Sequence, residues 1–235
     1  MAAPFSFPAQ ISRKRGPKGT ARSFLGTRNV TRIIFMKTID FCKLRRELDD
    51  AITYADFDLA RQLAQEGLNG AQSRELLGEI MYFKAQREII NEDYAAAVNC
   101  LDLAIKYNPS DGAAYNDRAL CIIELGGDEG RALADFDKGI EAEPDYANVY
   151  HNKGWRLNKL GRHQEAILYF EKALELDPGR AVTYENLADT YLNLGEKQKA
   201  IRAFREALRR LKHSRTEIKD QIETKIKILM DSGMR

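Results

Sequence analysis

A recurrence of about 34 residues is the feature that most restricts the fold of this chain. From Tyr150 to Pro178, small and apolar side chains follow a fixed order, which returns 34 residues later, from Tyr184. The same order begins 35 residues earlier at Tyr115, and the extra residue falls in the glycine-rich segment 126–130, where a turn can absorb it. Such a period indicates repeated units of one supersecondary structure that stack side by side.

Each unit is predicted to contain two helices. The apolar positions within 150–160 fall on one helical stripe, and those within 166–174 fall on a second. Gly161 ends the first helix because glycine adopts the left-handed C-terminal conformation at little cost, and Pro178 stops the second. One pair cannot bury both stripes by itself, so neighbouring pairs must stack.

Two weaker copies precede these units, one from Met81 to Pro109 and a faint one from Leu44 to Leu68. The units resemble the tetratricopeptide repeat, whose unit of about 34 residues is a pair of antiparallel helices. The resemblance covers about residues 41–212. Basic residues replace the family's leucine or terminal proline at Lys84, Arg118, Lys153 and Lys212. The resemblance implies an all-α, tetratricopeptide-type α-α superhelix of about five helical hairpins with a C-terminal capping helix.

The pattern divides the chain into a basic leader (1–38), a repeat array (39–213) and a capping helix with a short tail (214–235). The strongest repeat units are 112–146, 147–180 and 181–212. The capping helix carries a single apolar stripe of Ile218, Ile222, Ile226 and Leu229. A stack of hairpins needs such a helix, apolar on one side and polar on the other, to cover its last unit.

The leader differs from the repeats in charge. Residues 1–40 carry eight Lys/Arg and one acid, which leaves 29 Lys/Arg and 34 Asp/Glu in residues 41–235. Four interpretations stay open: a disordered tail, a start-site artefact with translation beginning at Met36, a targeting peptide, and a nucleic-acid-binding arm. A secretory signal is disfavoured because no central apolar run follows the charges.

The motifs of catalytic and metal sites are absent from the sequence. Its three histidines have no cysteine or carboxylate at metal-ligand spacing, and its three cysteines are far apart. The glycine-rich segment 126–130 lacks the lysine and hydroxyl residue of a phosphate-binding loop. No apolar run approaches the roughly 18 residues of a membrane span. We therefore expect a cytoplasmic protein that is not an enzyme, holds no cofactor or metal, and does not enter a membrane.

The resemblance implies that the first helix of each unit lines a concave surface. Side chains of these helices outside the packing stripe are then candidates to face a ligand. They are Asp117, Leu120, Asn148, His151, Asn152, Trp155, Asn158, Lys159, Asn186, Asp189 and Asn193. Among these only Lys159 is a Lys or Arg, which disfavours a clamp for a peptide's C-terminal carboxylate.

Asp117, Asn152 and Asn186 recur at one position of successive units and form a predicted polar ladder. An asparagine amide can bind the N–H and C=O of one residue of an extended peptide. The alternative is an amide that is solvated or bonded to the neighbouring helix. Trp155, the only tryptophan, is expected to point into the groove, away from the packing face, with a packing role between helices as the alternative.

The leading hypothesis is a protein–protein interaction adaptor or scaffold that binds an extended peptide of unknown identity in its concave groove. One alternative is a homo-oligomeric scaffold that pairs through the stripe of the C-terminal helix. A third hypothesis, which we disfavour, is a nucleic-acid binder that uses the leader and a basic cluster near the C-terminus. That cluster comprises Arg209, Arg210, Lys212, His213, Arg215 and Lys219.

Overall fold

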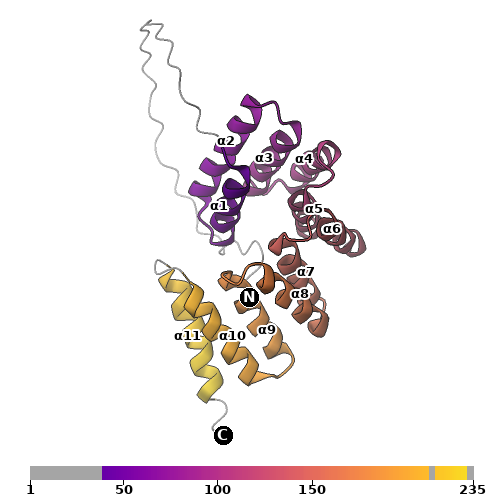
Figure 1. Ribbon diagram of the computed structural model, residues 1–235. Coiled ribbons are helices and arrows are strands. Elements are labelled where there is room, and N and C mark those ends of the chain that lie inside the picture. The colour runs from indigo at the N-terminus through magenta and orange to yellow at the C-terminus, as the bar shows by residue number, and fades with distance from the viewer. Residues whose placement is uncertain (1–38, 212–214, 232–235) are drawn as a thin grey trace, which may run out of the picture.

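The computed structural model describes residues 39–211 and 215–231, and in these ranges every regular element is a helix. The helices are α1 (Phe41–Thr53), α2 (Phe57–Ser73), α3 (Leu77–Ile90), α4 (Tyr94–Tyr107), α5 (Gly112–Glu124), α6 (Glu129–Ala142), α7 (Ala147–Lys159), α8 (His163–Leu176), α9 (Ala181–Asn193), α10 (Lys197–Arg210) and α11 (Thr216–Asp231). Figure 1 shows them as successive hairpins that stack into a curved array, with α11 at its end. The predicted all-α superhelix of hairpins is confirmed. The interpretations of the leader fall outside the described residues, as do Lys212 and His213.

The turn inside each hairpin uses the same backbone conformation. Gly126, Gly161 and Gly195 have φ of 65°, 76° and 74° in the last three hairpins. In the first two hairpins the equivalent residues are Ala55 and Glu92, with φ of 58° and 64°. Only glycine adopts this left-handed conformation without steric cost, so the first two turns lack the residue that marks the others in the sequence.

The hairpin core repeats with the same period as the sequence. One large apolar residue of each second helix from α4 onward is fully buried, and these residues are Leu101, Phe136, Phe170 and Phe204. The first helix comes close enough that a Cβ on Gly154 would lie 3.1 Å from ring atoms of Phe170 and from the carbonyl oxygen of Ala166. A side chain at position 154 would therefore displace Phe170 or the α8 backbone by a few tenths of an ångström, so glycine suits this close packing.

Two of the basic departures from the family pattern are compensated by nearby acids. Arg118 donates to both carboxylate oxygens of Asp135 at 2.8 and 2.7 Å, and to Asp102 at 2.6 Å. Lys153 forms an ion pair with Asp137, and its ammonium lies 4.6 Å from the centre of the Tyr169 ring. Each cation thus joins its own helix to neighbouring helices at a position where the family has leucine.

The C-terminal helix covers the last hairpin. Ile222 and Ile226 of α11 are 1% and 9% exposed and belong to the apolar cluster that also contains Ile201 and Phe204 of α10. The predicted cap is confirmed. The stripe on which the homo-oligomer hypothesis depended is therefore occupied within the chain.

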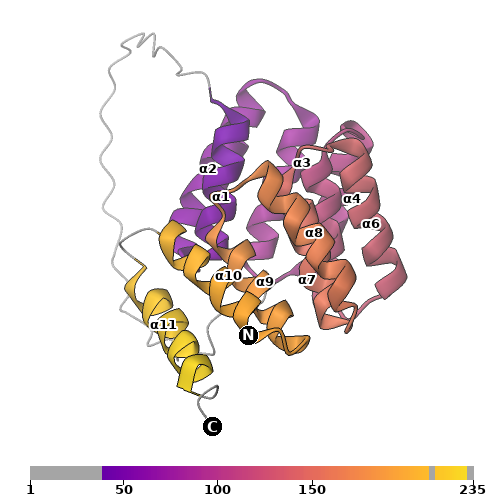
Figure 2. The ribbon, with the colours of Figure 1, turned by 60° about the horizontal axis from the view of Figure 1, so that its bottom comes forward.

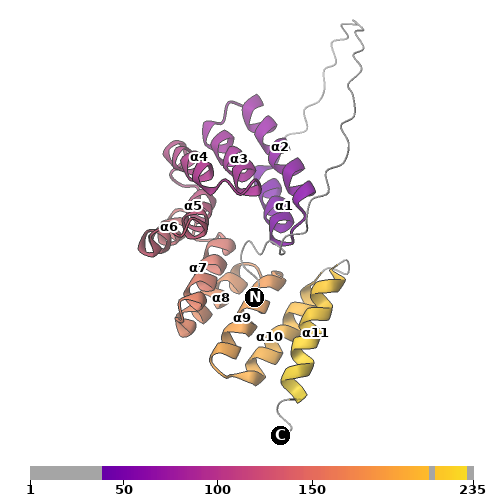
Figure 3. The same ribbon diagram turned by 180° about the vertical axis from the view of Figure 1, so that it is seen from behind.

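The array curves until its first helix meets its C-terminal part (Figures 2 and 3). A guanidinium nitrogen of Arg180, before α9, donates to Asp49 of α1 at 2.7 Å across 131 residues of sequence. The guanidinium of Arg215 lies 4.4 Å from the centre of the Tyr54 ring, just after α1. These side chains close the concave side of the superhelix. Across both described ranges, none of the helices combines the length and hydropathy needed to span a bilayer.

Candidate functional site

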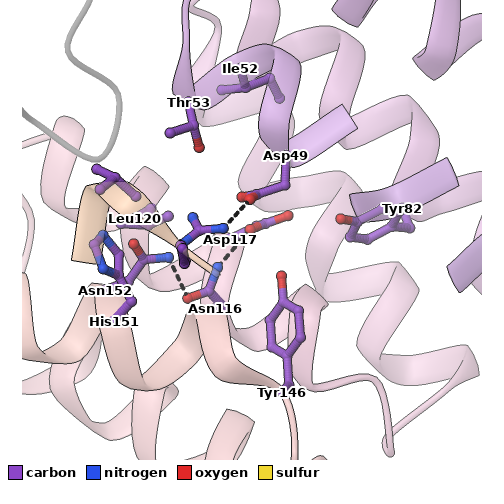
Figure 4. Close-up of a pocket in the computed structure, with 12 residues that line it drawn as sticks. Asp49, Ile52, Thr53, Tyr82, Asn116, Asp117, Leu120, Tyr146, His151 and Asn152 are labelled. Carbon is purple, nitrogen blue, oxygen red and sulfur yellow. Dashed lines mark hydrogen bonds and ion pairs between the residues drawn. The ribbon is translucent and has the colours of Figure 1, made fainter. Parts of the chain in front are cut away.

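The concave side narrows to a small cavity of about 30 Å³ at the centre of the superhelix (Figure 4). Helices α1, α3, α5 and α7 contribute side chains to it, as do Tyr146, Arg180 and Val182 near the starts of α7 and α9. Four residues of the predicted groove line it: Asp117, Leu120, His151 and Asn152. A cavity of this volume holds about one water molecule, so it is too small for a peptide chain.

The first part of the predicted ladder is bonded from helix to helix. Gln86 of α3 donates its amide to one oxygen of Asp117 at 2.5 Å, and Asn116 donates to the other oxygen at 2.8 Å. Asn152 of α7 then donates to the side-chain oxygen of Asn116 at 2.9 Å (Figure 4). Asn152 is only 5% exposed. These contacts correspond to the alternative in which the amides bond to a neighbouring helix.

The second part of the ladder is centred on His151. Burial, reinforced by the positive charge of Arg180, lowers the pKa of His151 well below its ordinary value, so the ring is neutral near pH 7. Its Nδ1 lies 2.9 Å from the hydroxyl of Thr183, and its Nε2 lies 3.4 Å from the amide nitrogen of Asn186. A neutral ring that donates from Nδ1 and accepts at Nε2 satisfies both contacts. Like Asn152, Asn186 is bonded within the chain and 5% exposed.

The remaining polar candidates lie outside this network. Asn158 accepts from Asn193 at 3.1 Å, and Asn148 donates to the hydroxyl of Tyr146 at 3.2 Å. Asp189 pairs with Lys225 of α11 at 3.3 Å, and Lys159 is exposed. The structure therefore places some of the eleven candidates in a buried network, some in the apolar core and the others in separate polar contacts or at the surface. Their contact with a peptide stays a prediction.

The expected orientation of Trp155 requires a correction. Its indole is 6% exposed and belongs to the apolar cluster of Leu157 and Leu187, against which Tyr54 also packs. The indole N–H has no hydrogen-bond acceptor among the described residues. Trp155 does not project into an open groove, because the tight curvature places apolar side chains around it. Leu120, also expected to face a ligand, is buried as well.

A larger cavity of about 750 Å³ lies where the first helices begin, and we call it the mouth. Its wall comes from α1 and from the loops before α5, α7 and α9. Its ionisable residues are Cys42, Arg45, Arg46, Glu47, Asp49, Asp50, Glu79, Asp111, Glu143, Asp145, Tyr146, Asp177 and Arg180. Only Asn148 of the sequence-based candidates lines it, because most of its other residues lie on α1, whose repeat is the faintest in the sequence, or in loops outside the helical period.

Two of the three arginines of the mouth are already paired. Arg45 holds Asp111 through two bonds of 2.8 Å and also contacts Glu79 at 3.0 Å, while Arg180 binds Asp49. Burial raises the pKa of Glu143, and the charges of Asp111 and Asp145 raise it further, against the opposing effect of Arg45. Since eight Asp/Glu and only three Arg line the mouth, the potential at this end of the superhelix is negative.

Comparison with known proteins adds family and fold information. The tetratricopeptide repeat model matches residues 84–130, 126–181 and 157–219. The Protein STIP1 homolog of Dictyostelium discoideum is 40% identical over 76 residues, which are 32% of this chain and 13% of that protein. Hsp70-Hsp90 organizing protein 3 of Arabidopsis thaliana is 34% identical over 119 residues, which are 50% of this chain and 18% of that protein. The chain thus spans less than a fifth of either relative.

A solved structure of similar fold is a thermophilic tetratricopeptide protein of Thermus thermophilus. It superposes with a TM-score of 0.61 at 16% identity, over 80% of this chain and 98% of that one. At this identity the likeness concerns the fold alone. The superhelix itself is therefore an architecture already seen in a solved structure.

Proposed function

Because the chain belongs to the tetratricopeptide repeat family, we propose that it is a protein-interaction module that holds a peptide segment of another protein at the mouth of its superhelix. The observation that carries the proposal is the mouth itself, a cavity of about 750 Å³ on the concave side. Its volume lies in the range of about 300–1,000 Å³ that is usual for ligand-binding cavities. We assign the module no catalytic step.

The mouth is a better peptide site than the ladder in this closed form of the array. The ladder amides already have partners, and the central cavity of about 30 Å³ leaves no room for a backbone. A peptide could reach the ladder only if the contact between Arg180 and Asp49 opened. At the mouth, Phe41, Tyr146 and Leu176 offer apolar surface beside charged groups. Such surface is needed, because three hydrogen bonds of about 1 kcal/mol each fall short of the roughly 8 kcal/mol of micromolar binding.

We expect Ser110→Tyr to weaken peptide binding at least about ten-fold, equivalent to about 1.4 kcal/mol. Ser110 is exposed and lines the mouth, so a tyrosine there occupies space that a peptide needs. Peptides are first selected from a random display library on the full-length chain, and their affinities are then measured by fluorescence anisotropy.

The matched control is Asn99→Tyr, which adds the same side chain at an exposed position of α4 away from the mouth. It should leave the affinities unchanged. The proposal fails if no peptide is enriched above background. A loss of affinity in Asn152→Ala with none in Ser110→Tyr would overturn the placement at the mouth, because the ladder would then be the binding site.

A further inference from the structure

The mouth carries a large excess of carboxylates. Eight Asp/Glu and three Arg line it. Asp49, Glu79 and Asp111 are paired with Arg45 or Arg180. Glu143, Asp145 and Asp177 also line the mouth, and none of them forms an ion pair within the described ranges. We call these three residues the acidic triad.

A second feature of the mouth also points to a ligand. The side chain of Arg180 is 10% exposed, and its Nε–H has no acceptor among residues 39–211 and 215–231. A buried donor without an acceptor carries a free-energy cost of about 1–3 kcal/mol, which a small shift toward a ligand carbonyl would remove. Arg180 lines the mouth together with the acidic triad. The site therefore suits a chain that brings positive side chains and backbone carbonyl groups.

The same protein contains a segment of that chemistry. Residues 1–38 carry eight Lys/Arg and no Asp/Glu. The segment joins the repeats just before α1, and Phe41 and Cys42 of α1 line the mouth. Lys18 is only about twenty residues from α1 in the sequence, so the leader and the mouth are parts of one chain, and linkage of this kind gives an effective concentration of about millimolar.

We propose that the mouth binds the chain's own basic leader, with lysines and arginines of residues 13–32 paired to the acidic triad. Phe41 and Tyr146 of the mouth offer apolar surface to the aliphatic stems of lysine or arginine, and the carboxylates offer acceptors to their charged ends. A bound leader competes with any peptide of another protein for the mouth. The inference uses the same cavity as the proposed function but does not require it.

Carbodiimide cross-linking of the full-length chain tests the leader contact directly, because this reagent joins an amine to a carboxylate only when the two are in contact. We expect cross-links from Lys14 or Lys18 to Glu143, Asp145 or Asp177, identified by mass spectrometry of the monomer. Their yield should fall at least ten-fold in the triple variant Glu143→Gln, Asp145→Asn, Asp177→Asn. It should also fall in molar salt, which reduces the Debye length to about 3 Å.

The matched control removes three exposed acids outside the mouth, Glu66→Gln, Glu171→Gln and Glu217→Gln, so its net charge equals that of the triad variant. It should keep the full cross-link yield. The inference is overturned if leader cross-links fall on Glu66, Glu171 or Glu217 as often as on the triad, or if they join two chains. It is also overturned if no leader cross-link forms at low salt. Because a bound leader competes for the mouth, the display selection is repeated on a full-length variant in which the two lysines and five arginines of residues 13–32 are replaced by glutamine. A library that yields no peptide on this variant would reject the proposed function and leave the cross-linking result of the unaltered leader unaffected.

Discussion

Replacing Trp155 with alanine is expected to lower the free energy of unfolding by about 3–5 kcal/mol, the usual cost of truncating a large buried aromatic residue. The indole is 6% exposed and packs in the apolar cluster that joins α7 to α9. The cavity left by the substitution would be lined by rigid helices that cannot close on it. Urea unfolding followed by circular dichroism measures the change without relying on tryptophan fluorescence.

Leu168→Ala in α8 is the control, because this leucine is 65% exposed. Its substitution should change the free energy of unfolding by no more than about 0.5 kcal/mol. Trp155→Phe should lie between the two, since it keeps most of the apolar contact. If Trp155→Ala is as stable as Leu168→Ala but binds peptide more weakly, Trp155 contacts a ligand in the groove, and its assignment to the apolar core is wrong.

The sequence period predicted the helical hairpins correctly but gave the wrong surroundings for Trp155. This difference shows what a sequence period can determine. Steps of three and four residues give the angle of Trp155 around α7, and this angle is on the concave side. They do not give the curvature of the stack. That depends on contacts such as Arg180 with Asp49, which are 131 residues apart and leave no periodic signal. The same curvature buries Asn152 and Asn186, so their availability to a peptide could not be read from their spacing.

The fold was predictable even where the local signal was weak. In the first two hairpins, Ala55 and Glu92 occupy the left-handed turn position that glycine takes in the other three. The small and apolar pattern around them was enough to indicate helical pairs, because burial of a stripe outweighs the cost of one strained turn residue. The residues of the mouth could not be predicted from the repeat pattern. Asp145 and Asp177, for example, lie in loops, where side chains do not follow the helical period.

Asp117→Asn is expected to stabilise the protein increasingly as the pH rises. Asp117 lies in the central network, where burial raises the pKa of its carboxyl from the ordinary 3.8 to about 7. The hydrogen bonds from Asn116 and Gln86 lower the pKa in part, and the charges of Asp49 and Asp111 raise it. The folded state therefore binds more protons than the unfolded state between these two pKa values, so the wild-type protein loses stability as the pH rises through this window.

An asparagine at 117 removes this ionisation while keeping the network. Its oxygen can accept from Asn116, and its amide can donate to the oxygen of Gln86 once the Gln86 amide is flipped. At about 1.4 kcal/mol per pKa unit, the stability of the variant relative to wild type should rise by about 2–3 kcal/mol between pH 5 and pH 8. The measurement is urea unfolding of both proteins at the two pH values.

Two features make this difference a test of Asp117 alone. His151 is neutral in the folded state and is present in both proteins, so its own proton uptake on unfolding cancels in the comparison. Leu168→Ala changes no titratable group, and its difference from wild type should be the same at both pH values. If the difference for Asp117→Asn is likewise constant, the carboxyl is charged at both pH values and solvated. The central cavity would then hold water around an ion, and the closed network of Gln86, Asn116 and Asn152 would be wrong.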